Sequence, residues 1–359
     1  MISDLTPEQL KLRYEPKPVK QVTSERQLTA ARFTPCGTRI LAGGYDAMLR
    51  LWDFSAEQPT ELASSAEHRG WVQGLALHPT EKVAYTADSW GRLQEVSYLE
   101  DALVVQWHKD QAHDGWIRAL AINPDASALV SVGRDQQVRV WNPADGSQLR
   151  QIDAHHEDVY ACAFHPDGKQ FVSGDAKGTI LHWSTEQDEP LGRFDASELF
   201  SVLRLQDVGG VHALLFSHDG KKLFVGGTRP KNGGNVQGTP LLLVFDVESR
   251  ELSETIELGS AADVYVRHVE EHADGFLMAT TSGNPGTGKL QFLRLGDEQP
   301  FYVNTALSNC HHVSIHPDGK QLAVTTTVRG SNGNGRPLKD GEYVGNHSPI
   351  HLLAIPESP

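Results

Sequence analysis

Histidine, serine and aspartate occur together near the middle of the chain, at a spacing that suits either catalysis or structure. His113, Ser131, Asp135 and Trp141 follow one another within one short region. A Ser-His-Asp set activates its hydroxyl for nucleophilic attack when that hydroxyl faces a cleft. The same groups can also satisfy one another, because a buried imidazole, carboxylate and indole N–H each need a hydrogen-bond partner. We predict a structural hydrogen-bond chain, with a catalytic set as the alternative.

Two other patterns suggest a bound ligand but have the wrong geometry for one. His155-His156 and His311-His312 are adjacent on predicted strands. Adjacent strand residues point to opposite faces, so neither pair can chelate a metal. The segment at 283–289 superficially resembles a phosphate-binding loop, but a strand follows it where such a loop has Ser or Thr and a helix. We therefore expect no metal and no cofactor.

Composition and net charge limit the kinds of partner that we expect this chain to bind. The chain has 359 residues, 39% of them apolar and 22% charged, which is typical of a folded globular protein. Its formal charge is 32 minus 46, or -14, and no basic run interrupts that balance. Partners bound through phosphate groups, such as nucleic acids and anionic membranes, are therefore not expected. The one basic loop cluster, Arg329, Arg336 and Lys339, is offset by Asp340 and Glu342.

The termini and cysteines give an expectation about location. The first residues contain Asp4 and lack an apolar run of signal-peptide length, and no later stretch reaches the roughly 18 apolar residues of a membrane span. We expect a cytoplasmic location. Cys36, Cys162 and Cys310 lack metal-ligand spacing and are expected to be reduced thiols.

The elements that must position these side chains emerge from an internal repeat. An apolar stretch, a Pro-Asp-Gly-like turn and a second apolar stretch recur seven times. The turns are centred on Pro35, Pro79, Pro124, Pro166, His218, Ala273 and Pro317. Their separations, 42 to 55 residues, match the period of a four-stranded propeller blade.

The third repeat shows the four strands of such a blade best. Strands are predicted at Trp116–Ile122, Ala128–Val132, Gln137–Trp141 and Ser147–Ile152, with turn residues between them. A single four-stranded sheet cannot bury its apolar faces alone, so neighbouring blades must pack face to face.

These residues resemble the WD-repeat family. The third repeat carries Ala112-His113, Ser131, Asp135 and Val140-Trp141-Asn142, which look like the family's Gly-His, Ser, turn Asp and Trp-Asp elements. The first repeat carries Asp46 and Leu51-Trp52-Asp53, and the fourth carries His155, Ser173 and Trp183 with Lys177 at the turn position. The resemblance covers about residues 20–355 and is weaker in the last three repeats. It implies a propeller, a structural role for the His113, Ser131, Asp135 and Trp141 chain, and a docking surface.

We accordingly predict an all-β fold, a seven-bladed β-propeller of four-stranded antiparallel blades. Blade 7 lacks one strand, which we expect the N-terminal segment 18–24 to supply. Residues 1–17 are predicted to form an extension with a short helix N-capped at Thr6-Pro7-Glu8-Gln9. Residues 18–359 form a single propeller. Its blades are expected at about 25–66, 67–108, 109–153, 154–196, 197–257, 258–304 and 305–357 plus 18–24.

One face of the propeller is predicted to carry the function. The connections from outer to next inner strand and from second to third strand all lie on that face. Three long insertions, Arg229–Thr239, Ser282–Gly288 and Arg329–Ser348, fall between second and third strands and would stand side by side. Loops of this length either bind partners or are flexible decoration, and both readings stay open.

Tryptophans mark the other half of the same face. Trp71 and Trp116 occupy equivalent positions at the start of the first strand in blades 2 and 3. Trp90 stands where blade 3 has Asp135, so we expect it at a turn tip, in place of the structural aspartate. Exposed indoles together suit a protein-interaction hot spot, and the alternative is that they pack against each other between blades.

A ring of polar residues is predicted around the axis, one step along each first strand. It reads Thr29, Gln73, Arg118, Tyr160, His212, Arg267 and His311. These groups could hold an anion such as a partner's carboxylate, and we favour the alternative that they form ordinary salt bridges between blades.

We predict a non-catalytic scaffold that binds a protein or peptide, as a monomeric propeller within a complex. The binding face is expected to contain Trp71, Trp90, Trp116, Arg118, Tyr160, His212, Arg267 and His311. The alternative is a propeller hydrolase or lyase acting on a small molecule in the axial channel through His212, Arg267 and His311. An enzyme of this shape normally needs acidic residues or a metal at the axis, and the ring contains neither Asp nor Glu.

Overall fold

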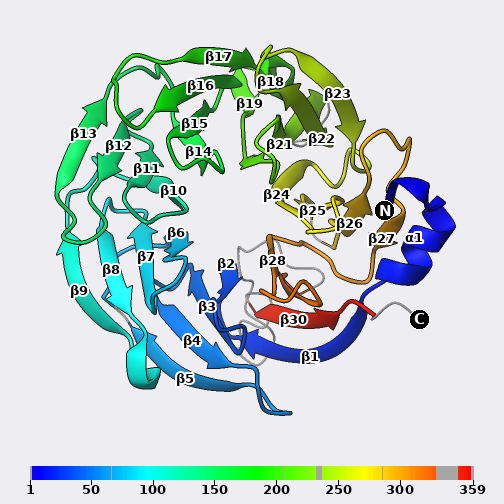
Figure 1. The fold of residues 1–359 in the computed structure, drawn as a ribbon, viewed down its shortest axis with the longest axis horizontal. Helices are drawn as coiled ribbons and strands as arrows, with labels where there is room; N and C mark the ends of the chain where they lie inside the picture. The colour runs from blue at the N-terminus through cyan, green and yellow to red at the C-terminus, as the bar shows by residue number, and fades with distance from the viewer. Residues whose placement is uncertain are drawn as a thin grey trace.

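Seven four-stranded antiparallel sheets form a closed ring around a central axis (Figure 1). The computed structural model describes residues 2–65, 67–203, 205–231, 237–284, 286–328 and 347–356. Each sheet is one blade, and in every blade but the last the strands run in sequence order from the axis to the rim. The predicted seven-bladed β-propeller is confirmed.

The first four blades are built from sixteen strands. Blade 1 contains β2 (Leu28–Phe33), β3 (Arg39–Gly44), β4 (Leu49–Asp53) and β5 (Thr60–Ser65). Blade 2 contains β6 (Val72–Leu77), β7 (Val83–Asp88), β8 (Leu93–Ser97) and β9 (Val104–Lys109). Blade 3 contains β10 (Ile117–Ile122), β11 (Leu129–Gly133), β12 (Val138–Trp141) and β13 (Gln148–Ile152). Blade 4 contains β14 (Val159–Phe164), β15 (Gln170–Asp175), β16 (Thr179–Ser184) and β17 (Gly192–Asp195).

The last three blades follow the same plan. Blade 5 contains β20 (Ala213–Phe216), β21 (Lys222–Lys231), β22 (Gln237–Asp246) and β23 (Leu252–Glu257). Blade 6 contains β24 (Tyr265–Glu271), β25 (Leu277–Ser282), β26 (Leu290–Leu293) and β27 (Tyr302–Asn304). Blade 7 contains β28 (His312–Ile315), β29 (Gln321–Thr325), β30 (Ser348–Ala354) and β1 (Lys17–Ser24).

The ring closes through the N-terminal strand. β1 pairs antiparallel with β30, from Lys17 opposite Ala354 to Ser24 opposite Ser348. Sheet hydrogen bonds therefore join the two ends of the chain, and β30 is not left as a free edge. The predicted completion of blade 7 is confirmed.

The core lies between blades. Val130 and Val140 of blade 3 pack with Phe171 and Trp183 of blade 4 in one buried cluster. Both faces of each sheet are covered in this way, which explains why inner strands such as β11 and β15 are almost entirely buried.

Short helices and turns complete the chain. Helix α1 (Pro7–Tyr14) begins after Thr6, with a capping box between Thr6 and Gln9, and lies at the edge of the ring beside β27 (Figure 1). Its Tyr14 hydroxyl donates to Asp274 at 2.7 Å. Single turns of 3-10 helix lie at Ile2–Asp4, Leu99–Asp101 and Ser197–Leu199. Among the described residues, no helix has the length and apolar character needed to cross a membrane.

The repeated turn links several neighbouring blades. The side chain that ends the first strand reaches the turn glycine of the following blade. Asn123 Nδ2 donates to Gly168 O at 3.2 Å, His165 Nε2 to Gly220 O at 3.0 Å and His272 Nε2 to Gly319 O at 3.0 Å. The His or Asn before the turn proline is thus an inter-blade contact, which explains its recurrence.

Two features of the chain differ from the prediction. A hairpin of β18 (Phe200–Leu203) and β19 (Gln206–Gly209) stands between blades 4 and 5, where we expected only the start of blade 5. The insertion Arg229–Thr239 is largely strand, because β21 and β22 stay paired as far as Lys231 and Gln237. The prediction of a long loop there was wrong. Apart from Gly238 in β22, its Gly and Asn residues lie within 232–236, outside the described residues.

The other two insertions have a different status. Ser282–Gly288 connects β25 and β26, and all of it except residue 285 is described. Most of Arg329–Ser348, with the basic cluster Arg329, Arg336 and Lys339 and the acidic Asp340 and Glu342, lies outside the described residues. The row of three loops therefore stays a prediction.

Candidate functional site

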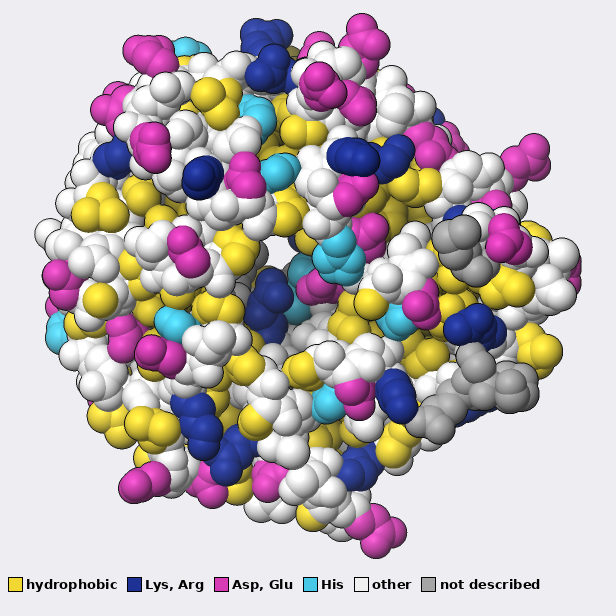
Figure 2. Space-filling model, in the orientation of Figure 1, with side chains coloured by type: hydrophobic (Ala, Val, Ile, Leu, Met, Phe, Trp, Pro, Cys, Tyr) yellow, Lys and Arg dark blue, Asp and Glu magenta, His cyan; other side chains and the backbone are white. Residues whose placement is uncertain are grey.

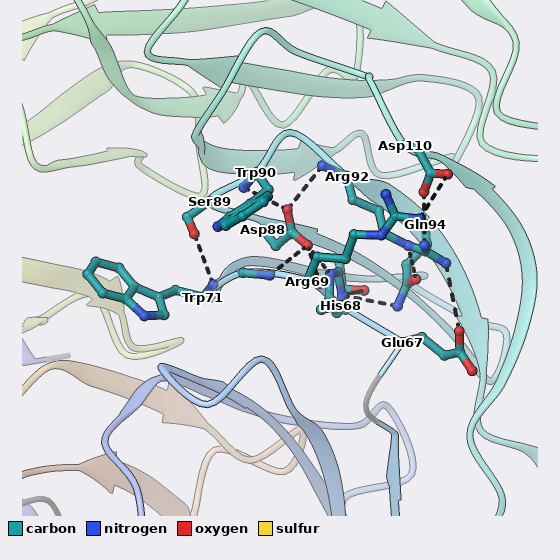
Figure 3. A network of polar contacts seen from close by, with 12 residues as sticks. Glu67, His68, Arg69, Trp71, Asp88, Ser89, Trp90, Arg92, Gln94 and Asp110 are labelled. Atoms are coloured by element: carbon teal, nitrogen blue, oxygen red, sulfur yellow. Dashed lines mark hydrogen bonds and ion pairs between the residues drawn. The ribbon is translucent and has the colours of Figure 1, made fainter.

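A buried polar network in blade 2 surrounds the carboxylate of Asp88 (Figure 3). His68 Nδ1 donates to Asp88 Oδ2 at 3.1 Å. Four backbone N–H groups also donate to this carboxylate, those of Arg69, Gly70, Trp90 and Arg92, at 2.9 to 3.3 Å. Asp88 is fully buried, yet these bonds lower its pKa to about 2 against the opposing effect of burial. The carboxylate therefore holds the two segments that carry Trp71 and Trp90.

The remaining contacts fix the orientation of His68. Arg92 Nε donates to Gln94 Oε1 at 3.0 Å, so the amide nitrogen of Gln94 faces His68 Nε2, 3.0 Å away. The Thr86 hydroxyl lies 2.8 Å from the same nitrogen. Since the amide of Gln94 donates, Nε2 is the acceptor and the proton lies on Nδ1, toward Asp88. Arg92 is itself anchored by Asp110 at 2.9 Å.

The expectation that blade 2 lacks its structural aspartate was wrong. Trp90 does occupy the position of Asp135, but Asp88, two residues earlier, supplies the carboxylate from the end of β7. Blade 4 makes the same change, since His155 Nδ1 pairs with Asp175 at 3.1 Å while Lys177 contacts Glu157. The signal was an Asp three residues before the turn glycine in both repeats, at 88–91 and 175–178.

Blade 3 contains the set that opened the sequence analysis. His113 Nδ1 lies 2.7 Å from Asp135 Oδ1, and its Nε2 lies 2.7 Å from the Ser131 hydroxyl. Trp141 Nε1 donates to the same hydroxyl at 2.8 Å. Burial lowers the pKa of His113 despite the neighbouring carboxylate. Ser131 is fully buried between the indole and the imidazole, so its hydroxyl faces no cleft.

Above the blade 2 network lies a group of four aromatic side chains, Tyr45, Trp71, Trp90 and Trp116, which we call the aromatic trough. The rings of Tyr45 and Trp71 lie 4.7 Å apart, and those of Trp71 and Trp116 lie 5.3 Å apart edge to face. Trp71 is 43% and Trp90 70% exposed. The four residues line a cavity of about 500 Å³. Trp71 and Trp116 therefore pack together, as one interpretation of the sequence expects. Trp71 and Trp90 remain accessible, as an interaction surface would require.

Arg118 and Tyr160 extend this face toward the axis. The guanidinium carbon of Arg118 lies 3.6 Å from the Trp116 ring centre and 5.1 Å from that of Tyr160. Arg118 also pairs with Asp158 at 3.6 Å, and burial lowers its pKa. The stacked arginine therefore supports Trp116 from the channel side.

The aromatic trough opens at both ends. Tyr45 also lines the axial channel, and Trp90 also lines a groove of about 790 Å³ toward the rim of blade 2. The rim groove is mainly basic, with Arg69, Arg92 and Lys109 against Asp110. The prediction did not include this groove, because its basic residues come from three separate segments: the connection before β6, the connection between β7 and β8, and the end of β9.

All seven residues of the predicted axial ring line one cavity of about 450 Å³. Figure 2 shows an opening at the centre of the ring, bordered by cationic, histidine and acidic side chains. His212 packs between Tyr160 and Tyr265, with ring centres 5.4 and 4.6 Å apart. The unpredicted β19 adds Asp207 to the lining, so a carboxylate reaches a channel whose ring itself has none.

The glycine-rich segment at 283–289 uses its lysine internally. Lys289 Nζ lies 2.9 Å from Asp263 Oδ2, and Asp263 also accepts from the backbone N–H of Ser260 and Gly288. These donors hold the pKa of Asp263 below its usual value against burial. Within the described part of the chain, no group of three His, Cys, Asp or Glu side chains could hold a metal.

Gly91 sets the turn that presents Trp90. Its φ is +87°, and a Cβ there would lie 2.2 Å from the backbone oxygen of His113. We expect Gly91→Ala to lower the free energy of unfolding by about 2 to 3 kcal/mol, because backbone must move to accept the methyl group. Chemical denaturation measures this. Gln136→Ala is the matched control, since Gln136 has φ 67° in the equivalent turn of blade 3. Equal losses for the two variants would contradict the argument.

Comparison with known proteins agrees with this geometry. The family described as "WD domain, G-beta repeat" matches residues 17–53, 105–142 and 146–184. Each segment spans the outer strand of one blade and the first three strands of the next. The first three strands of blade 2 are not matched, and there Val96 replaces the tryptophan found at Trp52, Trp141 and Trp183. Its network uses Thr86 and Gln94 instead.

This chain is similar over parts of its length to several curated proteins. It is 27% identical over 187 residues to protein hir1 of Schizosaccharomyces pombe, 26% over 162 residues to protein groucho of Drosophila melanogaster, and 28% over 212 residues to WD repeat-containing protein 90 of Homo sapiens. These matches cover 42%, 45% and 58% of this chain, and 19%, 22% and 11% of the relatives. The chain thus spans less than a quarter of each relative's length. These matches show that the chain contains WD repeats, and in the structure the matched repeats form part of a seven-bladed β-propeller.

Proposed function

We propose that this propeller is a non-catalytic scaffold that binds a protein or peptide segment in the aromatic trough. The observation that carries the proposal is the exposure of Trp71 and Trp90 above a rigid, fully hydrogen-bonded network. Indoles held in place lose little conformational entropy on binding, and tryptophan is enriched among the residues that dominate binding energy.

The polar surroundings support the same proposal. The aromatic trough continues into a basic rim groove and into the channel, which gives a partner a path across the whole of blade 2. A partner segment could bury an apolar side chain against the indoles and place polar groups at either end. Such a combination of an apolar centre and a polar rim is usual at protein interfaces.

The alternative, a hydrolase or lyase in the channel, finds less support. Burial and nearby arginines lower the pKa of both His212 and His311 to about 3. An imidazole of such low basicity is a poor general base near neutral pH. The network histidines of blades 2 and 3, His68 and His113, are buried and already bonded to carboxylates.

The double variant Trp71→Ala, Trp90→Ala tests the proposal. We expect partner recovery in affinity purification from the native source to fall at least tenfold, since truncated hot-spot residues each cost about 2 kcal/mol or more. The melting temperature should fall only modestly, because Trp90 is largely exposed and Trp71 is only partly buried against Tyr45 and Trp116.

The matched control is Leu149→Ala, which removes an exposed apolar side chain from β13 on the rim of blade 3. Partner recovery by this variant should equal that of the unmodified protein. If the tryptophan variant also recovers its partners normally, the choice of face is wrong.

A further inference from the structure

One sector of the axial channel contains a cation without an ion-pair partner. The channel lining includes three arginines, Arg32, Arg118 and Arg267. Arg118 pairs with Asp158 at 3.6 Å, and Arg32 with Glu270 at 3.7 Å. Arg267 forms no ion pair with any residue that the structure describes, and its guanidinium carbon lies 5.0 Å from the Tyr265 ring centre.

The two histidines of the ring flank this arginine in the order of the blades. His212 comes from blade 5 and His311 from blade 7, with Arg267 of blade 6 between them. His212 Nε2 has no hydrogen-bond partner within the described part of the chain. His311 Nε2 lies 3.4 Å from the amide nitrogen of Gln27.

Other unpartnered polar atoms lie in the same wall. His312, only 5% exposed, lines the cavity with no partner for its Nδ1 among the described residues. His268 stacks on it with ring centres 3.7 Å apart, and its Nδ1 is likewise unpartnered within the structure described. Buried polar atoms are normally satisfied, so this wall is built for a polar occupant.

We propose that His212, Arg267 and His311 form a binding site for a single carboxylate at the mouth of the axial channel. A guanidinium presents parallel N–H groups that match the two oxygens of a carboxylate. One negative charge fits better than two, because among the described residues Arg267 alone of the three channel arginines lacks a carboxylate partner, and Asp207 already contributes a negative charge to the lining. The site lies in blades 5 to 7, away from the aromatic trough, and goes beyond the proposed function.

Binding at this site should take up a proton. Neutral His212 can donate through only one of its two ring nitrogens, and protonation makes both nitrogens donors. Burial is the main cause of the low pKa of His212, and Arg267 and Arg118 lower this pKa further. A bound anion would raise the pKa and so oppose all of these effects. The other titratable groups of the lining are Arg32, Tyr45, Arg118, Tyr160, Cys162, Asp207, Tyr265, His268 and His312. The carboxylate affinity should therefore increase as the pH falls below neutrality.

Isothermal titration calorimetry of the whole chain with sodium acetate tests the site, with sodium chloride at equal ionic strength as the reference. Two buffers of different protonation enthalpy report the proton uptake. N-acetyl-aspartate amide, in a second arm, distinguishes a partner's side chain from a free carboxylate. Arg267→Gln should weaken acetate binding about tenfold, and Arg193→Gln, a change to an exposed arginine on β17, should not alter it. His212→Asn should abolish the proton uptake.

The outcomes separate this site from the aromatic trough. Saturable acetate binding that depends on Arg267 supports the site, whether or not Trp71→Ala, Trp90→Ala affects partner recovery. Tighter binding of the aspartate amide supports a partner side chain as the source, and tighter binding of acetate supports a free carboxylate. No effect beyond that of chloride, or binding that Arg267→Gln leaves unchanged, overturns the proposal.

Discussion

Replacing Asp88 with alanine is expected to lower the free energy of unfolding by about 3 to 5 kcal/mol, because it leaves several buried donors without an acceptor at a cost of about 1 to 3 kcal/mol each. The change removes the acceptor for His68 and for four backbone N–H groups in a fully buried setting. The unpaired donors cannot be rehydrated without opening the blade. Urea denaturation followed by tryptophan fluorescence measures the loss.

Asp46→Ala is the comparison for this prediction. Asp46 lies in the corresponding region of blade 1, where it accepts from Arg50 and from the backbone of Met48 but binds no histidine. Its loss should cost clearly less. The dependence of stability on acid gives a second check. The pKa of Asp88 is about 2 in the folded chain and 3.8 as its ordinary value. The contribution of Asp88 to the free energy of unfolding is therefore complete above about pH 4 and disappears as the pH falls through 2. Equal costs for the two variants would show that the network adds nothing.

Acid is expected to destabilise the propeller well before its carboxylates titrate. Burial lowers the pKa of His182 and His351 to about 4, and that of His212 and His311 to about 3. Below pH 6.5 the unfolded chain binds protons that the folded chain does not, so stability falls with pH. Each fully buried imidazole contributes roughly 1 kcal/mol per pH unit until its folded pKa is reached.

His182→Leu isolates this effect. His182 is 3% exposed, and neither ring nitrogen has a hydrogen-bond partner among the described residues. The leucine variant should be at least as stable as the original at pH 7.5, and about 2 kcal/mol more stable at pH 4.5. Denaturation at both pH values measures the difference. His156→Leu, at an exposed position, is the control. An unchanged pH dependence in His182→Leu would contradict the assignment.

The architecture could be predicted because each blade repeats the same local signals. Strands at Gln137–Trp141 and Ser147–Ile152 were expected within one residue of β12 and β13. The closure by β1 followed from counting strands, since a blade with three strands leaves an exposed edge. These inferences rest on periodicity and on turn residues, which neighbouring blades do not alter.

The details of the candidate site depend on contacts between segments and were less accessible. In blade 2 the carboxylate lies at the end of β7 and not in the turn. It still binds the histidine, because His68 Nδ1 reaches Asp88 from its usual position. The hairpin of β18 and β19 was not predicted, because its strands are short and polar and apolar residues alternate only weakly in them. The rim groove is lined by Arg69, Arg92 and Lys109, which come from separate segments of the chain. No local sequence pattern therefore predicts it.

The exposure of individual side chains also depends on neighbours. Trp71 and Trp116 occupy equivalent positions, yet Arg118 covers Trp116 while Trp71 stays 43% exposed. The low pKa of His212 requires both burial and the two arginines from other blades. The sequence identified the members of the ring but not which of its cations would lack a partner.

Site-specific photo-crosslinking tests the central claim most directly. A photoreactive phenylalanine analogue at position 90, in the aromatic trough, is compared with the same analogue at position 149 on β13, where the native Leu149 is 54% exposed. The proposal predicts that position 90 crosslinks a discrete protein partner in the native cell and that position 149 does not. Crosslinks from position 149 alone, or equal yields at both positions, would contradict partner binding at the aromatic trough.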